Sequence, residues 1–410
     1  MHVVIFEGSH WKDFLPLSLS RAVFELVTGL STLLEKQIRF LQPTRLSLWV
    51  RPELHDHCAM KIVPGLKIPT TINQPLDDQP ALLVNGRTLL MRKFEHPEQD
   101  SVMVEEGDVI RCARVTDAGL SPADVMNRTD RWLKLLKLPQ IAPQGRITES
   151  LWDLISWNEE SLISDAAHFK GPRKSPVEGP FHLVNEKDVW LADEVKLGPG
   201  CVLDASKGPI VIDSHATIGA NAVIEGPCYI GPQSAIAPLT YLRPGCSIGP
   251  VCKIGGEVSN TIVLGYSNKG HDGFVGDSYL GRWVNFGAGT VTSNLKNTYG
   301  EVSIKMGSRE VLTGRKFLGS LIGDHTKTAI GTRLMTGTYI GFCCMLAGSN
   351  PAPRFMKSLT FWTDRGEERY RMDRAREVIE RVFTRRHREW SHVDQQIMDY
   401  VEKVAPQVEV

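Results

Sequence analysis

The 410-residue chain lacks an excess of charge of either sign, since 47 Lys and Arg residues face 47 Asp and Glu residues. This balance argues against a protein dedicated to nucleic acid or to a membrane surface, which favour a basic excess. The sequence also lacks any apolar run near the ~20 residues that span a bilayer. Met1–Glu7 shows neither the basic leader nor the cleavage site of a secretory signal. We therefore expect a cytoplasmic protein that binds neither nucleic acid nor membrane.

Paired cysteines are also lacking, because none of the eight cysteines forms a CxxC motif. The adjacent Cys343 and Cys344 suit neither a zinc site nor an ordinary disulfide. Reduced thiols in a cytoplasmic protein are the simplest interpretation of this pattern.

Glycine is scarce at both ends of the chain and abundant in the middle. Residues 1–190 hold nine of the 36 glycines, residues 191–350 hold twenty-six, and residues 351–410 hold one. Such a step excludes a single ordinary globular domain over the central part. A linker is indicated by Gly171-Pro172 and Gly179-Pro180. The predicted divisions are an α/β domain at 1–160, a linker at 161–190, a repeat domain at 191–350 and a helical segment at 351–410.

The glycine-rich part carries a six-residue repeat. An aliphatic residue recurs at every sixth position from Ile212 to Ile254, and a small or β-branched residue lies four positions after each one. Aliphatic side chains that point inward, with small residues at tight corners, are typical of a coil of short parallel strands. Three hexads make one triangular turn, so we predict a left-handed parallel β-helix. An earlier set, Leu191, Leu197 and Leu203, precedes this run. The small positions of both sets include four cysteines, which we expect to be packing residues: Cys201, Cys228, Cys246 and Cys252.

The repeat is interrupted twice. Its rhythm breaks through Glu257–Gly273 and resumes at Val275. A second interruption near Leu295–Lys316 is predicted to be a loop that leaves the coil and returns in register, because the glycines on either side keep six-residue spacing. Loops that project from a rigid scaffold often carry function.

The flanking regions have other patterns. Buried strands are predicted at 3–6, 46–50 and 82–84, and helical spacing covers 29–41. Residues 353–404 show a charged helical pattern, and such a helix would cap or brace the open end of the coil.

His271 is the main catalytic candidate. It lies in the irregular Gly265–Gly273 stretch beside Lys269 and Asp272. Imidazole exchanges protons near neutral pH, so it can accept a proton from an amine nucleophile. The simpler alternative is a surface histidine. A metal shared with His215 or His325 is possible only through assembly of several chains, so the metal ligands stay unassigned.

The interrupted part of the coil resembles a known family. The stretch His271–Asn294 is similar to the acetyltransferase half of bifunctional bacterial N-acetylglucosamine-1-phosphate uridylyltransferases/glucosamine-1-phosphate acetyltransferases, including the short step from Val275 to Leu280. Leu242–Gly245 is similar to the family's LRPG motif. The chain as a whole resembles the divergent alternative branch, through Leu15–Lys36, Asn85–Arg87 and Gly265–Gly273.

The resemblance implies acetyl-CoA-dependent N-acetylation of an aminosugar 1-phosphate. His271 matches the general base, and Ala288 matches the position whose backbone N–H holds the thioester oxyanion. Asn285 and Asn294 match sugar-contacting asparagines, and Arg243 matches the arginine that binds the phosphate.

Two positions depart from the family pattern. The family's second phosphate-binding lysine corresponds to Asn260-Thr261, where this chain has no lysine, and Lys269 is the candidate substitute. The family's sugar-contacting tyrosine is replaced here by Phe274. These departures leave the identity of the aminosugar open.

The N-terminal region departs further from sugar nucleotidyltransferases, which it resembles. The glycine-rich triphosphate loop is replaced by Glu7–Trp11, so Arg21 and Lys36 are candidates for the positive charge. Asn85 is the third candidate for nucleotide binding, in a segment where the family has the Mg²⁺-binding aspartate. Mg²⁺ is the cofactor that the resemblance implies. A degenerate domain without turnover, and a structural ion pair for Arg21, are the alternatives.

The sequence therefore predicts a bifunctional transferase that makes a nucleotide sugar. Its substrates would be acetyl-CoA, an aminosugar phosphate and a nucleoside triphosphate, and the resemblance implies a homotrimer. One alternative is a sugar-1-phosphate nucleotidyltransferase whose coil serves only oligomerisation. The other is a non-catalytic nucleotide-sugar-binding protein.

Overall fold

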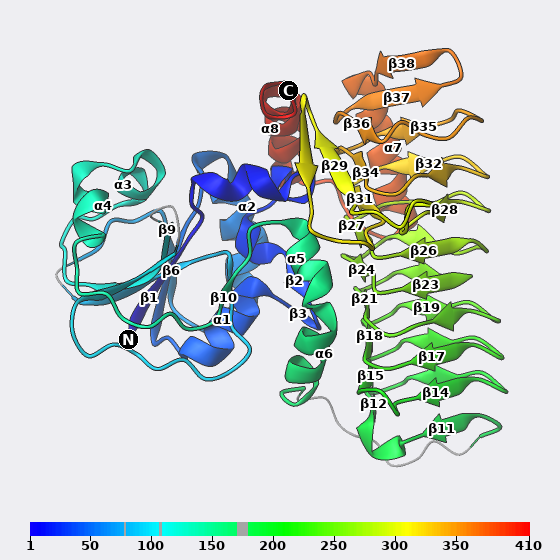
Figure 1. Ribbon diagram of the computed structural model, residues 1–410, viewed down its shortest axis with the longest axis horizontal. Coiled ribbons are helices and arrows are strands. Elements are labelled where there is room, and N and C mark those ends of the chain that lie inside the picture. The colour runs from blue at the N-terminus through cyan, green and yellow to red at the C-terminus, as the bar shows by residue number, and fades with distance from the viewer. Residues whose placement is uncertain (78, 106–108, 170–178) are drawn as a thin grey trace.

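The computed structural model describes residues 1–77, 79–105, 109–169 and 179–410. An α/β domain lies beside a long coil of parallel strands, with two helices, α5 (Leu151–Ser156) and α6 (Asn158–Ala166), between them (Figure 1). No helix within those ranges is long and apolar enough to cross a membrane. Gly171-Pro172 of the expected linker falls outside the described residues.

The α/β domain is built on a six-stranded sheet. Its strand order is β5-β4-β1-β6-β9-β8, in which the first four strands are parallel and β9 is antiparallel to both neighbours. The predicted strands at 3–6, 46–50 and 82–84 are confirmed as β1, β4 and β6. The sheet consists of β1 (His2–Phe6), β4 (Arg45–Trp49), β5 (Thr70–Ile72), β6 (Ala81–Asn85), β8 (Ser101–Glu105) and β9 (Val109–Val115).

Helices and short strands surround this sheet. Helix α1 (Leu33–Leu41) confirms the helical spacing, and Thr32 caps it by accepting a hydrogen bond from the Glu35 amide. The other elements are β2 (Val27–Thr28), β3 (Ser31–Thr32), α2 (His55–His57), β7 (Thr88–Leu89), α3 (Pro122–Asn127), α4 (Asp130–Leu135) and β10 (Arg146–Ile147).

The predicted β-helix is confirmed, and it has three faces. Paired residues on successive turns, such as Val211 and Tyr229, are eighteen residues apart, as three hexads per turn require. The first face contains β11 (His182–Val184), β14 (Val202–Asp204), β17 (Val223–Glu225), β20 (Tyr241–Leu242), β23 (Glu257–Ser259) and β26 (Phe274–Gly276), and it continues with the pair β28 (Val291–Thr292) and β33 (Arg333–Leu334).

The second face of the coil turns toward the α/β domain. The Tyr279 hydroxyl and the Val27 amide illustrate this contact, at 2.7 Å. This face consists of β12 (Val189–Leu191), β15 (Ile210–Ile212), β18 (Cys228–Ile230), β21 (Cys246–Ile248), β24 (Ile262–Val263), β27 (Tyr279–Leu280), β31 (Ser320–Ile322), β34 (Thr338–Ile340) and β36 (Phe355–Met356).

The third face completes each turn and has its own strands at both ends of the coil. It begins with β13 (Lys196–Leu197), β16 (Thr217–Ile218), β19 (Ala235–Ile236), β22 (Lys253–Ile254) and β25 (Asn268–Lys269), and ends with β32 (Lys327–Thr328), β35 (Met345–Leu346), β37 (Thr360–Thr363) and β38 (Gly366–Arg369).

The coil is longer than expected, because its parallel strands begin with β11 inside the expected linker at 161–190 and continue past residue 350. All eight cysteines are free and buried.

The two interruptions have different structures. Lys253 pairs with Asn268, only fifteen residues later, so the first break is a turn shortened by three residues. It stays in the coil as β23, β24 and β25, and the expectation of an irregular loop there is wrong. The second interruption leaves the coil and returns in register as predicted, with Val291 paired to Arg333. The predicted loop is a hairpin, made of β29 (Ser303–Met306) and β30 (Arg309–Leu312).

The C-terminal helices do not cap the coil, and the expected helical segment at 351–410 begins with the strands β36, β37 and β38. The helices are α7 (Met372–Arg385) and α8 (His392–Val408). Phe383 of α7 stacks on Trp283 at a coil corner, with ring centroids 4.5 Å apart, and Gln396 of α8 donates to Asp56 of the α/β domain. The last strand of the coil, β37, is covered by β38 in antiparallel pairing. The helices therefore brace the side of the coil and tie it to the α/β domain (Figure 1).

Candidate functional site

His271 lies at the corner between the third and first faces, directly after β25. Its side chain is exposed, and nothing in the described part of the chain bonds to its ring. The corner is tight, because a Cβ atom on Gly255 of the preceding turn would lie 2.7 Å from the Gly270 carbonyl oxygen. The ring is thus held on a rigid corner while its nitrogens stay available.

Ala288 occupies the same corner one turn further along. Phe286, two residues before it, donates from its amide to the Asn268 carbonyl oxygen at 2.8 Å, which places the two corners on adjacent turns. The carbonyl oxygen of Ala288 accepts a hydrogen bond from the Gly331 amide at 2.7 Å. Within the described ranges no group accepts a bond from the Ala288 amide. A free N–H therefore lies about one strand spacing, ~5 Å, from the corner of His271.

Arg243 and Asn294 lie at the opposite corner of the first face. Arg243 follows β20, and its guanidinium contacts Glu257 at 3.3 Å, with the two side chains 48% and 40% exposed. Asn294 donates to Asp277 at 2.7 Å, and Asn260 donates to the other oxygen of that carboxylate at 2.7 Å. Burial raises the pKa of Asp277, while the two asparagines act in the opposite direction. Arg243 is available to an anion, whereas Asn294 already has a partner.

Asn285 belongs to the third face rather than the first. Its side-chain oxygen accepts a bond from Asn268 at 3.2 Å, and Asn268 in turn accepts one from Arg386, just after α7, at 2.6 Å. The structure thus brings His271 and Ala288 together, with Asn285 on the neighbouring face.

Lys269 does not point toward a substrate. Its ammonium group lies 2.7, 2.8 and 3.2 Å from the carbonyl oxygens of Gly255, His271 and Asp272. The side chain is only 4% exposed. An ammonium group has three N–H donors, and here each has an acceptor. The expectation that Lys269 binds the sugar phosphate is therefore contradicted by its position.

Arg21 forms an ion pair with the coil. Its guanidinium binds the carboxylate of Asp324, and both side chains are buried. The same carboxylate accepts bonds from the Ser20 hydroxyl at 2.9 Å and the Arg282 amide at 2.8 Å. This arrangement agrees with the alternative of a structural ion pair rather than with nucleotide binding.

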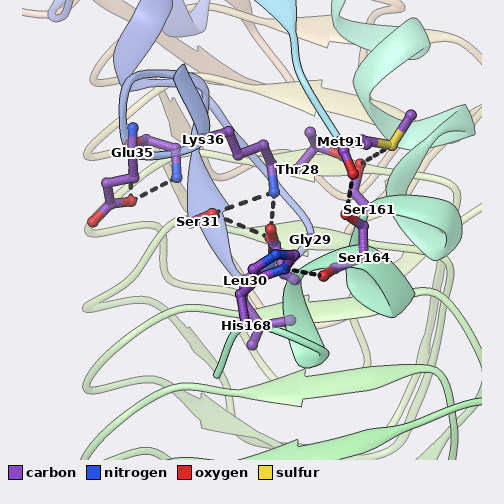
Figure 2. A network of polar contacts seen from close by, with 12 residues as sticks. Thr28, Gly29, Leu30, Ser31, Glu35, Lys36, Met91, Ser161, Ser164 and His168 are labelled. Carbon is purple, nitrogen blue, oxygen red and sulfur yellow. Dashed lines mark hydrogen bonds and ion pairs between the residues drawn. The ribbon is translucent and has the colours of Figure 1, made fainter. Parts of the chain in front are cut away.

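Lys36 is also committed to structure. Its side chain is fully buried and lies beside Ser31 (Figure 2). It binds the carboxylate of Asp165 on α6, which Arg39 also contacts at 2.6 Å. Asp165 accepts a further bond from the Leu30 amide at 2.8 Å. Burial lowers the pKa of Lys36, and the neighbouring Asp165 acts in the opposite direction. The network holds α6 against the α/β domain and leaves Lys36 unable to reach a nucleotide.

Asn85 closes a turn at the end of β6. Its side-chain nitrogen donates to the Ile110 carbonyl oxygen at 3.1 Å, and its oxygen accepts from the Arg87 amide at 3.1 Å. Throughout the described ranges, no three His, Cys, Asp or Glu side chains gather closely enough to hold a metal ion. Asn85 therefore supplies no carboxylate at the place where the resemblance implied a Mg²⁺-binding aspartate.

A hollow that the sequence did not reveal lies at the carboxyl ends of β4 and β5. Its volume is about 700 Å³. Ligands in open α/β sheets bind outside the carboxyl ends of the strands. In the sequence, this hollow could have been suspected from Trp11-Lys12, which follow the end of the predicted strand at 3–6. The hollow is lined by Trp11, Lys12, Val50, Arg51, Pro52, Glu53, Asn73, Pro75, Ser121, Pro122, Ala123, Met126, Asn127, Tyr400, Val404, Gln407 and Val408.

Arg51 supports the floor of this hollow. It contacts the buried Glu7 carboxylate at 3.1 Å, and its guanidinium lies 4.0 Å from the Trp11 ring centroid and 5.6 Å from that of Tyr400. Helix α8 therefore forms one wall of the hollow through a cation–π contact.

Known proteins resemble both halves of the chain. Residues 3–174 match the family model described as sugar nucleotidyl transferase. A bifunctional sugar-1-phosphate nucleotidylyltransferase/acetyltransferase of Sulfurisphaera tokodaii is 30% identical over 250 residues, covering 53% of this chain and 61% of that protein. A bifunctional protein GlmU of Methanocaldococcus jannaschii is 27% identical over 310 residues, covering 71% and 72%.

A solved structure shows a weaker likeness. The Arabidopsis UDP-N-acetylglucosamine acyltransferase matches 57% of this chain and 93% of its own, at 11% identity and a TM-score of 0.30. The match to the Methanocaldococcus jannaschii protein covers 71% of this chain and therefore includes parts of both domains. Residues 3–174 are thus similar to the sugar nucleotidyl transferase family, and the chain is similar to bifunctional sugar-1-phosphate nucleotidylyltransferase/acetyltransferases, of which it spans 61% in the Sulfurisphaera tokodaii protein.

Proposed function

We propose that the coil transfers the acetyl group of acetyl-CoA to the amine of an aminosugar 1-phosphate. One observation carries this proposal: the unpartnered His271 ring and the free Ala288 amide lie on adjacent turns of one corner. General-base catalysis needs an accessible imidazole, and acyl transfer needs an N–H donor for the oxyanion. The similarity to nucleotidylyltransferase/acetyltransferases supports the same reaction.

The reaction follows from these two groups. The His271 imidazole accepts a proton from the sugar amine while the amine nitrogen bonds to the thioester carbon. The Ala288 N–H donates to the oxygen that becomes negative. The C–S bond then breaks, and the imidazolium returns its proton to the leaving thiolate of CoA.

Arg243 supplies recognition of the phosphate in this proposal. A guanidinium presents several donors in one plane and suits a phosphate group. Its only ionic partner in the described ranges, Glu257, is exposed and easily displaced. Asn285 and Asn294 remain candidates for the sugar hydroxyls, although both carry intramolecular bonds that a substrate would have to exchange.

We also propose that the chain assembles as a homotrimer in the cytoplasm. The corner that carries His271 also carries Leu239 and Ile330, which are 76% and 79% exposed. Large exposed apolar side chains on either side of a reactive corner favour a partner coil beside it. The eight free thiols suit a reducing compartment.

The α/β domain is proposed to bind a nucleotide sugar in the hollow beside Trp11 and to transfer a nucleotidyl group onto the sugar 1-phosphate. In that transfer a sugar phosphate oxygen attacks the α-phosphorus of the nucleoside triphosphate, and pyrophosphate leaves. The match to the sugar nucleotidyl transferase family supports this activity.

A second candidate for this domain is binding without turnover. The absence of a clustered carboxylate site from the described residues favours this alternative. The commitment of Arg21 and Lys36 to buried ion pairs favours it as well.

Thiol release from acetyl-CoA tests the acetyltransferase. A panel of aminosugar phosphates is offered to the wild type, to His271→Ala and to His215→Ala, which changes a histidine at another coil corner. We expect a loss of about 10²–10⁴-fold in kcat for His271→Ala and no loss for the control. An undiminished rate in His271→Ala, or no thiol release with any aminosugar, contradicts the proposal.

Pyrophosphate release tests the α/β domain. UTP or dTTP is combined with sugar 1-phosphates, with and without Mg²⁺, and binding of the corresponding nucleotide sugars is measured by calorimetry. Release of pyrophosphate supports turnover, and binding without release supports the second candidate. Lys12→Ala, in the hollow, should weaken binding, whereas Lys61→Ala, outside it, should not.

A further inference from the structure

Lys269 occupies a position where the two preceding turns of the coil have isoleucine and the next turn has Phe286. It pairs in register with Ile254 on the preceding turn, and Ile254 pairs with Ile236 before that. All three positions point into the coil and are buried. A charged side chain in such a position is costly unless its polar atoms are satisfied. The hexapeptide repeat therefore does not explain why a lysine occupies this inward position.

The charge of Lys269 is satisfied at the corner that carries His271. The ammonium binds the carbonyl oxygens of His271 and Asp272 on its own turn and of Gly255 on the preceding turn. Space for it comes from Gly256, because a Cβ atom there would lie 2.9 Å from the lysine nitrogen. Gly256 also has a φ of +74°, which favours glycine.

Other corners between the third and first faces close in a different way. The Thr290 amide bonds to the Gly287 carbonyl oxygen at 3.1 Å, and the Ala222 amide bonds to that of Gly219 at 3.3 Å. At Ala329 the carbonyl oxygen instead accepts a bond from the Thr332 hydroxyl, at 2.9 Å. No equivalent bond closes 270–273 within the described ranges. The corner that carries the candidate base thus lacks the usual closure.

We infer that Lys269 is a positioning residue, whose ammonium replaces the missing turn closure and holds the backbone of His271 in place for acetyl transfer. This inference rests on the proposed function of His271. It assigns Lys269 a role different from phosphate binding, because its three N–H groups are all used by backbone carbonyls. A residue that holds a catalytic group affects turnover, whereas a phosphate ligand mainly affects substrate affinity.

The test replaces the charge while keeping the volume. Lys269→Met fits a position that accepts isoleucine on the two preceding turns, and Lys253→Met removes an exposed lysine from the third face as a control. We expect kcat to fall about 10- to 100-fold in Lys269→Met with KM nearly unchanged. The loss should be equal for aminosugars with and without a phosphate. A rise in KM confined to phosphorylated sugars overturns the inference.

A second measurement does not depend on activity. Amide hydrogen exchange of the full chain should be faster at residues 270–273 in Lys269→Met, and unchanged at the neighbouring corner 287–290. Equal exchange at 270–273 in both proteins overturns the positioning role. If the wild type transfers no acetyl group, the proposed function fails, and the exchange data still decide whether Lys269 holds the corner.

Discussion

The basic residues of the α/β domain and those of the coil are used differently. In the α/β domain, Arg21 and Lys36 are buried and bound to carboxylates. In the coil, Arg243 is exposed beside an exposed partner, and the His271 ring has none among the described residues. A buried cation in an ion pair is required for stability, because removing it leaves its carboxylate buried and unpaired, which destabilises the fold. Exposed and weakly paired groups are the ones free to meet a substrate.

Lys269 differs from the exposed basic residues of the coil, because it is buried. Its partners are backbone carbonyls rather than a carboxylate. The comparison therefore separates three uses of positive charge: joining domains, shaping a corner and binding an anion. Each use predicts a different response to mutation.

The largest effect is expected at Asp165, the acceptor of the buried network. Asp165→Ala leaves Lys36 and Arg39 without their carboxylate, and we expect the free energy of unfolding to fall by about 3–5 kcal/mol. Urea denaturation measures it. The matched control is Glu160→Ala on the same helix, whose pair with Arg146 is exposed, and it should cost under about 1 kcal/mol. Equal losses in the two variants would remove the distinction between buried and exposed pairs.

An intermediate effect is expected at Lys269 and depends on pH. Burial lowers the pKa of Lys269 from 10.5 to about 8, with Asp272 acting in the opposite direction. Between these two values the folded chain has lost a proton that the unfolded chain keeps, so the cost of burying the charge disappears as pH rises. The unfolding free energy of the wild type relative to Lys269→Met should therefore rise by about 3 kcal/mol from pH 8 to pH 10.5. A difference that stays constant over this range contradicts the prediction.

Much of the coil was predictable because its constraint is local. Each inward position needs an aliphatic side chain and each corner a small one, so the repeat can be read without knowing what it contacts. The projecting hairpin was predictable for the same reason, since the register resumes after it. A shortened turn and an irregular loop break the rhythm alike, and only the pairing of Lys253 with Asn268 distinguishes them.

The partners of the buried charges were not predictable. Arg21 binds Asp324, 303 positions along the chain, and Lys36 binds Asp165, 129 positions along. No local pattern marks such pairs, and an arginine in a nucleotide site has the same sequence appearance as one in an ion pair. The bracing helices were misplaced for a similar reason. An apolar stripe shows that a helix packs, and Phe383 does pack, but the stripe does not say against which surface.

The smallest effect is expected at Arg243, and it tests the exposed side of the comparison. Arg243→Ala should raise KM for an aminosugar 1-phosphate about tenfold, because a single charge-assisted contact is lost, and should leave kcat within about twofold. Stability should change by under about 1 kcal/mol, since the pair with Glu257 is exposed.

Glu257→Ala provides the opposing variant for Arg243. It frees the guanidinium from its competitor, so KM for the phosphorylated sugar should fall while KM for the unphosphorylated sugar stays the same. If Arg243→Ala instead destabilised the chain as strongly as Asp165→Ala, exposure would not separate binding residues from structural ones. If it altered KM for both sugars equally, Arg243 would contact the sugar rather than its phosphate. Only the phosphate-specific pair of opposite shifts agrees with a guanidinium that is held loosely by one carboxylate until the substrate replaces it.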